Sequence, residues 1–253
     1  MPQKNKKMKR SLKELLGYTL EIKDGNKGKT KDFLFDEKTW IIRYMEADFG
    51  NWLESKRVLI PRVFLKPPIW EDRLFPVDIS QSDIEKCPDI EDKLTVSRQY
   101  EEEMHKHYQT NPYWGGAVAA SRGLLFPPRP IGIPKKAVAE DESKSILRSF
   151  NQVEGYHIQA INGKLGHIDD IIIDDTDWQI VYLIVDTKNW LPWSKKVVIS
   201  ADWMDDISYL KKEIKIRLKI ETIKNAPEYQ SNDNISLQYE KSLYDYYSQS
   251  LIK

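Results

Sequence analysis

Asp32-Phe-Leu-Phe-Asp36 returns 138 residues later as Asp170-Ile-Ile-Ile-Asp174, and the fourth residue after each block is tryptophan. Glycines, tryptophans and tyrosines recur in the same register: Gly17 with Gly155, Gly25 with Gly163, Gly28 with Gly166, Trp40 with Trp178, Trp52 with Trp190 and, after a slip of one residue, Tyr108 with Tyr247. Residues 11–108 are therefore repeated, almost without gaps, as residues 149–247. A shared register of this length indicates a duplicated domain. What recurs is scaffold, because the repeated positions include no set of catalytic residue types.

The length of 253 residues fits two domains of roughly 100 residues each. We expect a disordered basic tail over residues 1–10, a first repeat with its C-terminal helix over residues 11–108, and a second repeat with its helix over residues 145–253. Residues 109–144 are expected to form a linker that its prolines keep extended and its glycines loosen. Trp114 favours the packing of part of this linker against a domain.

Each repeat begins with a predicted strand in which apolar and polar residues alternate, as they do over Tyr18–Lys23. Asp24-Gly25 follows, a dipeptide that accepts positive φ in a tight hairpin. The glycines at positions 28 and 166 predict a bulge or strong coiling where the second strand starts. Aromatic and β-branched runs continue the strand pattern. The sequence thus predicts a mainly β protein with two small antiparallel β-barrels in tandem, each of five or six strands and each followed by short helices.

The last predicted helix of each repeat begins after a serine, Ser97 or Ser236, a residue type that caps helix N-termini. Tyr100, Met104 and Tyr108 lie four residues apart and form an apolar stripe on the first of these helices, and the second helix carries the same stripe. The stripe is expected to pack on the barrel of its own repeat; the alternative is that it docks on a partner.

Turn glycines, strand pattern and tryptophans follow one another as they do in one family of small β-barrels. The matching positions are Gly17, Asp24-Gly25, Gly28, Asp32–Asp36, Trp40–Tyr44 and Asn51–Pro61 in the first copy, and Gly155, Gly163, Gly166, Asp170, Asp174, Trp178–Tyr182 and Asn189–Ile199 in the second. On these residues the chain resembles the PRC-barrel family. Ser97–Glu101 and Tyr113–Gly116 are similar to segments of bacterial tandem members of that family.

The resemblance implies a small β-barrel that serves as a binding module and not as an enzyme. Related barrels form the cytoplasmic part of the photosynthetic reaction-centre H subunit and the C-terminal domain of a ribosome-maturation factor. This sequence contains neither the membrane helix of the H subunit nor the separate N-terminal domain of the maturation factor. The resemblance therefore implies the fold and a protein-binding role, in a cytoplasmic protein, without a particular pathway.

The amino-acid composition limits the classes of function that we expect for this protein. The chain has 39 basic and 39 acidic residues, whereas a generic nucleic-acid binder is usually basic. The longest apolar runs have the length of a strand, so no transmembrane segment is predicted. With Cys87 as the single cysteine, no disulfide can form within the chain. Nucleic acid is thus an unfavoured partner, and a membrane-spanning role is not expected.

The sequence carries no familiar catalytic or metal-binding motif: it has no nucleophile elbow, phosphate-binding loop or paired cysteines. His105 and His107 lie two residues apart, so on a helix their side chains diverge and cannot bind one metal from a single face. The acidic run from Asp169 to Asp177 resembles a cation site, but aspartates in this pattern are typical of turns. We therefore predict no catalytic site, no cofactor and no metal, and we expect the protein not to be an enzyme.

Tryptophans are the candidates for an interaction surface, because aromatic residues are enriched in the cores of protein interfaces. The candidates are Trp52, Trp190 and Trp193. Packing inside a barrel is the alternative role for these residues. The expected partners are other proteins or the protein itself, as a homodimer or through pairing of its two barrels.

Two alternative functions remain open at this point. The first is an RNA- or ribosome-associated factor that uses the basic tail together with Lys56-Arg57 or Lys195-Lys196. The second is an enzyme whose site no motif reveals.

Overall fold

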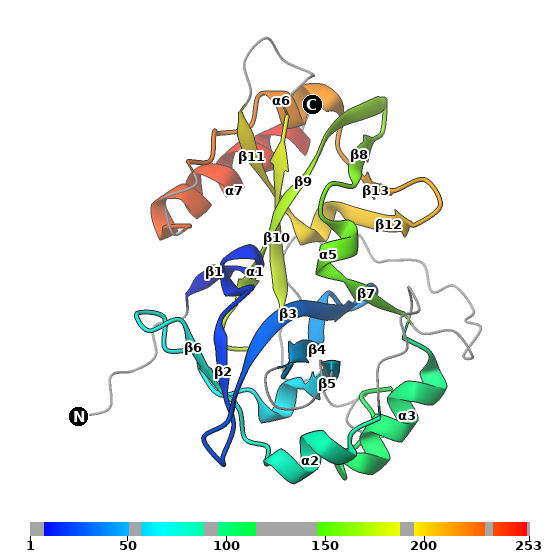
Figure 1. Ribbon diagram of the computed structural model, residues 1–253. Coiled ribbons are helices and arrows are strands. Elements are labelled where there is room, and N and C mark those ends of the chain that lie inside the picture. Colours follow the sequence, from blue (N-terminus) through cyan, green and yellow to red (C-terminus); the bar gives the residue numbers. More distant parts are fainter. Residues whose placement is uncertain are drawn as a thin grey trace. The chain divides into compact units, whose positions relative to one another are not determined.

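The computed structural model describes residues 8–50, 57–88, 96–114, 146–187, 195–230 and 235–251, which are mainly β-structure and form two mixed sheets (Figure 1). They divide into two compact units. The first unit comprises the described residues up to Leu16, Asp32–Arg43 and the chain from Arg148 onward; the second comprises Gly17–Lys31 and Tyr44–Leu147. The first unit therefore contains residues of both repeats.

A seven-stranded sheet lies in the first unit, in the order β11-β10-β9-β8-β13-β12, and β1 also pairs with β9. Its strands are β1 (Lys9–Ser11), β8 (His157–Ala160), β9 (Gly163–Asp174), β10 (Ile180–Asp186), β11 (Lys196–Ser200), β12 (Met204–Ser208) and β13 (Glu213–Ile216). The long strand β9 pairs antiparallel with β8, β10 and β1 (Figure 1). Ile171, Ile172 and Ile173 of β9 are buried, which explains why this stretch is uniformly apolar.

A six-stranded sheet has the order β5-β4-β3-β2-β6, and β7 pairs with β3. Its strands are β2 (Thr19–Glu21), β3 (Lys27–Asp36), β4 (Ile41–Asp48), β5 (Arg57–Pro61), β6 (Leu74–Pro76) and β7 (Leu147–Ser149). Large aromatic side chains are fully buried in the second unit, namely Tyr18, Tyr44, Phe49 and Phe75. The aromatic residues that marked the strands in the sequence thus supply much of the core of this unit.

Among the described strands neither sheet closes into a barrel, and neither is purely antiparallel, so the prediction of two closed antiparallel barrels was wrong in both respects. Strand β6 runs parallel to β2, and β13 runs parallel to β8. The physical reason lies in the 3₁₀ helices η1 (Arg62–Phe64) and η2 (Ala201–Trp203), which directly follow β5 and β11. Each of these tight turns ends the strand before it. The edge strands of each sheet, β5 with β6 and β11 with β12, are therefore joined along the chain and not by a ladder of hydrogen bonds.

The retained glycines at the start of the second strand serve two different purposes. In the second copy the register between β8 and β9 shifts at Gly166, which has φ 58°, so the predicted bulge is confirmed there. In the first copy Gly28 lies in a regular ladder opposite Leu20, so of the two predicted alternatives, a bulge or strong coiling, the bulge does not occur there. A Cβ at Gly28 would lie 2.6 Å from the ring of Phe49, so glycine is needed there for close packing.

Six helices are described: α1 (Leu12–Leu15), α2 (Gln81–Lys86), α3 (Arg98–His107), α5 (Phe150–Val153), α6 (Ile220–Lys224) and α7 (Leu237–Leu251). Ser97 and Ser236 each accept a hydrogen bond from the backbone N–H three residues on, at 3.1 Å, which confirms both predicted caps. Met104 and Tyr108 of the apolar stripe are buried. Met104 contacts Cys87 and Tyr108 contacts Phe64, so this stripe packs within its own repeat, as expected.

The predicted disordered tail needs a correction at its end. Lys9 and Arg10 lie in β1, where Arg10 stands opposite Ile173. Lys9 also forms an ion pair with Glu240 at 2.5 Å. Residues 9 and 10 are therefore held by pairing with β9, and Lys9 is also held by its ion pair with Glu240 of α7. Residues 1–7 and residues 115–145, which include most of the predicted linker, lie outside the described residues.

Candidate functional site

The residues before Gly17 dock on β9 through one half-buried carboxylate. Ser11 caps the short helix α1 by accepting a hydrogen bond from the Glu14 backbone N–H at 2.9 Å, and its hydroxyl donates to Asp170 Oδ2 at 2.5 Å. Asp170 Oδ1 also accepts from the backbone N–H groups of Lys13 at 3.2 Å and Ile171 at 2.7 Å. The Asp170 carboxylate therefore holds the N-terminus of α1 against β9, the strand to which Asp170 belongs. We name residues 8–15 the first docking segment.

The same arrangement recurs where the second repeat begins. The Ser149 hydroxyl donates a hydrogen bond to Asp32 Oδ2, and Asp32 Oδ1 accepts from the backbone N–H groups of Asn151 at 3.1 Å and Phe33 at 2.8 Å. We name residues 148–153 the second docking segment. Its serine and aspartate stand 138 positions from Ser11 and Asp170, and each bond joins a serine of one repeat to an aspartate of the other. All of these residues belong to the first unit.

Apolar contacts accompany both carboxylate bonds. Leu12 and Leu15 of the first docking segment are fully buried, and so are Phe150 and Val153 at the equivalent positions of the second. Burying a side chain of this size contributes roughly 1.5–3 kcal/mol. Each docking segment thus offers a serine cap, an apolar residue directly after it and a second apolar residue one helical turn later.

Ion pairs border the two docking segments at matching positions. Arg10 Nε lies 3.8 Å from Asp175 Oδ2, and Arg148 Nε lies 2.5 Å from Glu37 Oε2. Burial raises the pKa of Glu37, while the Arg148 guanidinium counteracts this rise. In the first docking segment Lys13 Nζ also lies 2.6 Å from Glu154 Oε1. Cationic docking segments therefore meet acidic acceptors.

Two tryptophans close the turns that end β3 and β9 and then cross-link two strands. Trp40 and Trp178 have φ of 56° and 61°, a conformation that is uncommon for a residue other than glycine. The backbone N–H of Ile42 donates to the Trp178 carbonyl at 3.0 Å, and that of Ile180 donates to the Trp40 carbonyl at 2.7 Å. The repeated tryptophans thus lie in turns joined by a reciprocal pair of backbone hydrogen bonds.

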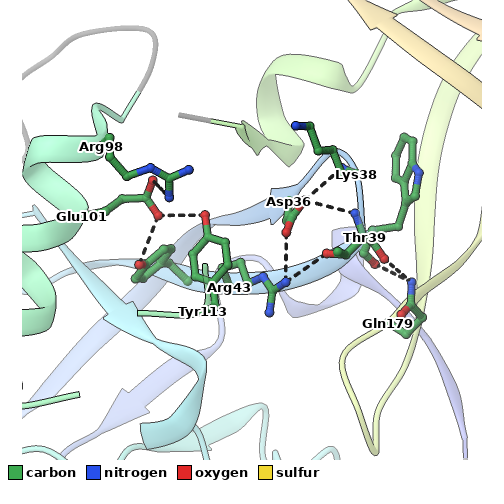
Figure 2. A network of polar contacts seen from close by, with 10 residues as sticks. Asp36, Lys38, Thr39, Arg43, Arg98, Glu101, Tyr113 and Gln179 are labelled. Atoms are coloured by element: carbon green, nitrogen blue, oxygen red, sulfur yellow. Dashed lines mark hydrogen bonds and ion pairs between the residues drawn. The ribbon is translucent and has the colours of Figure 1, made fainter. Parts of the chain in front are cut away.

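Polar side chains fix one of these turns. Asp36 accepts hydrogen bonds from the backbone N–H groups of Lys38 and Thr39, and Arg43 Nη2 donates to Asp36 Oδ2 at 2.9 Å (Figure 2). Gln179 Nε2 donates to the carbonyl of Thr39 at 2.8 Å. The carboxylate of Asp36 and its partner Arg43 are almost completely buried, so this cluster holds the turn rigid.

A second polar cluster lies in the second unit around Glu101, whose side chain is 1% exposed. Glu101 Oε2 accepts hydrogen bonds from the hydroxyls of Tyr113 at 2.9 Å and Tyr44 at 3.3 Å, and Arg98 Nη1 lies 3.4 Å from Oε1 (Figure 2). His105 Nε2 lies 2.9 Å from the Tyr44 hydroxyl. Burial lowers the pKa of His105, and the Arg98 charge lowers it further, which favours the neutral ring.

The residues nominated from the sequence are only partly within the described chain. Trp52, Trp190 and Trp193, the candidate interaction surface, lie outside the described residues. His105 and His107 do diverge: His105 contacts Tyr44, whereas His107 Nε2 lies 2.7 Å from the Asp83 carbonyl. Within the described ranges, no group of three or more histidine, cysteine, aspartate or glutamate side chains is arranged to hold a metal ion.

Other candidates have structural partners. Of the acidic run, Asp169, Asp170 and Asp175 bind the first docking segment, a role that we did not predict. The Tyr44–Glu101–His105 cluster was also missed. The signal that could have found the docking sites was the repeat itself, since serine and aspartate recur together. No helix in the described part of the chain has the length and hydropathy required to cross a bilayer.

The carboxyl group at the first docking site predicts a pH dependence. Burial raises the pKa of Asp170 to about 6, against the lowering effect of the hydrogen bonds from Ser11 and Lys13. The unfolded value is about 3.9, so the stabilisation from this proton is full below about pH 4 and is lost as the pH rises through about 6. We expect the stability of the wild type relative to Asp170→Asn to fall by about 2 kcal/mol between pH 4 and pH 7.

Urea unfolding of both proteins across this range measures the difference, because groups other than Asp170 titrate alike in the two proteins and cancel. Asparagine can still accept from the two backbone N–H groups and donate to Ser11, which preserves the docking geometry. A stability difference that stays constant over the whole pH range would contradict the prediction.

The comparisons with known proteins identify part of the chain. A PRC-barrel domain is found at residues 147–222, where the family model matches. A comparison with curated proteins found no match. The matched range runs from β7 through β13 into α6 and so includes the second docking segment, whereas the acceptor of that segment, Asp32, lies outside it.

Proposed function

We propose that this protein is a non-enzymatic interaction or assembly module, built from the PRC-barrel domain at residues 147–222 and from a first copy of the same kind over residues 11–108. PRC-barrel domains are protein-interaction modules, which supports a binding role for the matched region. The partners we propose are other proteins. The repeat in the sequence and the recurring contacts of the two docking segments support the proposal of a first copy.

The observation that carries this proposal concerns the buried carboxyl and imidazole groups. Each one in the described chain is bound to a group that holds the fold: Asp32 to Ser149, Asp36 to Arg43, Glu46 to Arg57, Glu101 to Tyr113, His105 to Tyr44, Asp174 to Thr176 and Glu213 to Lys164. Catalytic acids and bases are usually held in a cleft with their reactive atoms turned toward substrate. These groups are instead engaged in structural contacts, which favours a binding module over an enzyme.

The contacts of the basic residues favour protein partners over RNA. The cations nominated for RNA that the structure describes are engaged within the fold: Lys9 with Glu240, Arg10 with Asp175, Arg57 with Glu46, Lys195 with the Ala226 carbonyl and Lys196 with Asp169. A phosphate would have to compete with these contacts before it gained the electrostatic attraction on which nucleic-acid binding depends. Lys56 and residues 4–7 lie outside the described chain.

The proposed interaction surface is formed by Trp52, Trp190 and Trp193. Trp52 lies in sequence between β4 and β5, and the other two lie at the equivalent place between β10 and β11. Tagged full-length protein captured from the cells that produce it, with and without nuclease, tests this assignment. We expect a defined set of proteins that survives nuclease treatment and that Trp52→Ala or Trp190→Ala depletes roughly tenfold, the scale of one interface hot spot.

Leu210→Ala is the matched control, because this apolar side chain is completely exposed and its truncation leaves the fold intact. Circular dichroism of each variant distinguishes a folded protein that has lost only its interaction surface from a protein that no longer folds. Ribosomal proteins that disappear on nuclease treatment would instead favour the RNA-associated alternative. Turnover of a small molecule that one point mutation abolishes would contradict the non-enzymatic role.

A further inference from the structure

We propose that the first docking segment also docks on a second copy of this chain, so that two copies exchange residues 8–15 at the acceptor formed by Asp170 and β9. This inference rests on the proposed function, which it deepens by naming one partner. It follows from the composition of the docking site, from its charge and from the point at which the chain leaves it.

The acceptor contacts both the backbone of the docking segment and several of its side chains. Strand β1 pairs with β9 over three residues, and the backbone continues this pairing at Met8, whose carbonyl accepts from the Asp175 N–H at 3.0 Å. Asp170 then binds the serine that caps α1, and Leu12 and Leu15 are buried beyond it. Addition of a strand to a sheet, with side-chain pockets that set specificity, is a recurrent mode of peptide recognition.

Charge complementarity adds to this recognition. The docking segment carries Lys9, Arg10 and Lys13, which lie against Glu240, Asp175 and the pair formed by Glu154 and Asp169. A second copy of the chain supplies the same three cations in the same order. The acceptor therefore selects a basic segment with a serine followed by apolar residues.

The repeat makes a second copy of this chain the occupant that fits. Each chain holds two docking segments and two acceptors of the same chemistry, and each segment already binds an acceptor far away in the sequence, with Ser11 and Asp170 separated by 159 positions. No contact of the docked segment depends on which molecule supplies it. Exchange of identical elements between protomers is a low-cost route to a dimer for this reason.

The chain also offers a hinge at the required place. Leu16 is the last residue of this stretch in the first unit, and Gly17 is the first residue of the second unit. Gly17 has φ 75°, and a Cβ there would meet no atom within 4 Å, so the backbone can turn at this point. Within one chain the tether gives the segment an effective concentration on the millimolar scale, so we expect exchange when the segment is released at high protein concentration.

Complementation between two full-length variants tests the exchange. In the double variant Leu12→Asp/Leu15→Asp the docking segment can no longer dock, but the acceptor is unchanged. In Asp170→Arg the acceptor repels the basic docking segment, but the segment itself is unchanged. We expect each variant alone to run as a monomer of 29.7 kDa in light scattering and an equimolar mixture to shift to twice that mass. The control is Lys215→Ala, a substitution at an exposed side chain. Mixed with either docking variant in place of the other one, it is expected to leave that variant monomeric.

Wild-type protein supplies a second measurement that does not depend on the folding of a variant. Refolding at increasing protein concentration should increase the dimeric fraction, and tagged and untagged chains refolded together should co-purify. A mixture that stays monomeric, together with wild type that refolds only to monomer at every concentration, would overturn the proposal. Dimers formed equally by each variant alone would also overturn it, because another surface would then hold them. Neither result affects the capture experiment with the tryptophan variants.

Discussion

Replacing Glu101 with alanine is expected to lower the free energy of unfolding by about 4 kcal/mol. This side chain is almost completely buried and accepts hydrogen bonds from the hydroxyls of Tyr44 and Tyr113. Alanine leaves both hydroxyls without that acceptor and removes the fully buried carboxylate that balances the charge of Arg98. Loss of one partner of a buried charged pair is costly because the remaining charge stays desolvated. Urea unfolding followed by tryptophan fluorescence measures the effect.

Glu240 provides the matched control for Glu101, since it stands at the equivalent position of the second repeat. It accepts a hydrogen bond from the Tyr182 hydroxyl at 2.6 Å, and its side chain is 18% exposed. Water can therefore replace the carboxylate, and we expect Glu240→Ala to cost only about 1 kcal/mol. Equal losses for the two variants would show that burial does not set the cost of removing Glu101.

Gly166→Ala is expected to destabilise the protein by a similar amount, about 4 kcal/mol. A Cβ at this bulge would lie 2.3 Å from the Asp186 carbonyl oxygen, a backbone atom that cannot move without separating β9 from β10. The left-handed φ of 58° adds about 1–2 kcal/mol of strain for a residue with a Cβ. The steric term adds about 1–3 kcal/mol, as overpacking does in protein cores. Thermal and urea unfolding of the variant test this prediction.

Gly155→Ala separates the two causes of the Gly166 effect. Gly155 has a left-handed φ of 81°, but a Cβ there would meet no atom within 4 Å. Only the conformational strain remains, and we expect a loss of about 1 kcal/mol. If both alanine variants lose the same stability, the close approach of Asp186 has no measurable cost and the packing argument fails.

The local structure follows well from the sequence, because its causes are local. Alternation over Tyr18–Lys23 gives a strand, and Ser97 and Ser236 give helix caps, since both signals act over a few residues. The conformation of Trp40 was not predictable in this way. Its aromatic ring is typical of a strand, whereas its backbone takes a left-handed turn that Asp36 and Arg43 stabilise from either side.

The partner of each docking segment could not be predicted from the sequence. The duplication gives both aspartates, Asp32 and Asp170, the same local surroundings, so Ser11 has two acceptors of equal chemistry. The choice between them depends on the path of the chain, which no pattern of a few residues records. For the same reason the mixed sheets were missed: the parallel pairing of β6 with β2 joins segments more than fifty residues apart in the chain. The candidate tryptophan surface remains a prediction.

The large sequence separation between the first docking segment and its acceptor has a consequence for folding during synthesis on the ribosome. Asp170, the acceptor of Ser11, is made 159 residues after Ser11 itself. At typical elongation rates of 5–20 residues per second, Leu12 and Leu15 wait roughly ten to thirty seconds for the surface that buries them. Contacts of such high sequence separation also form slowly, because the loop must close before it is stabilised. The first unit is therefore completed only after β9 and the residues that follow it have been made, and chaperones that bind nascent apolar segments have that interval in which to act.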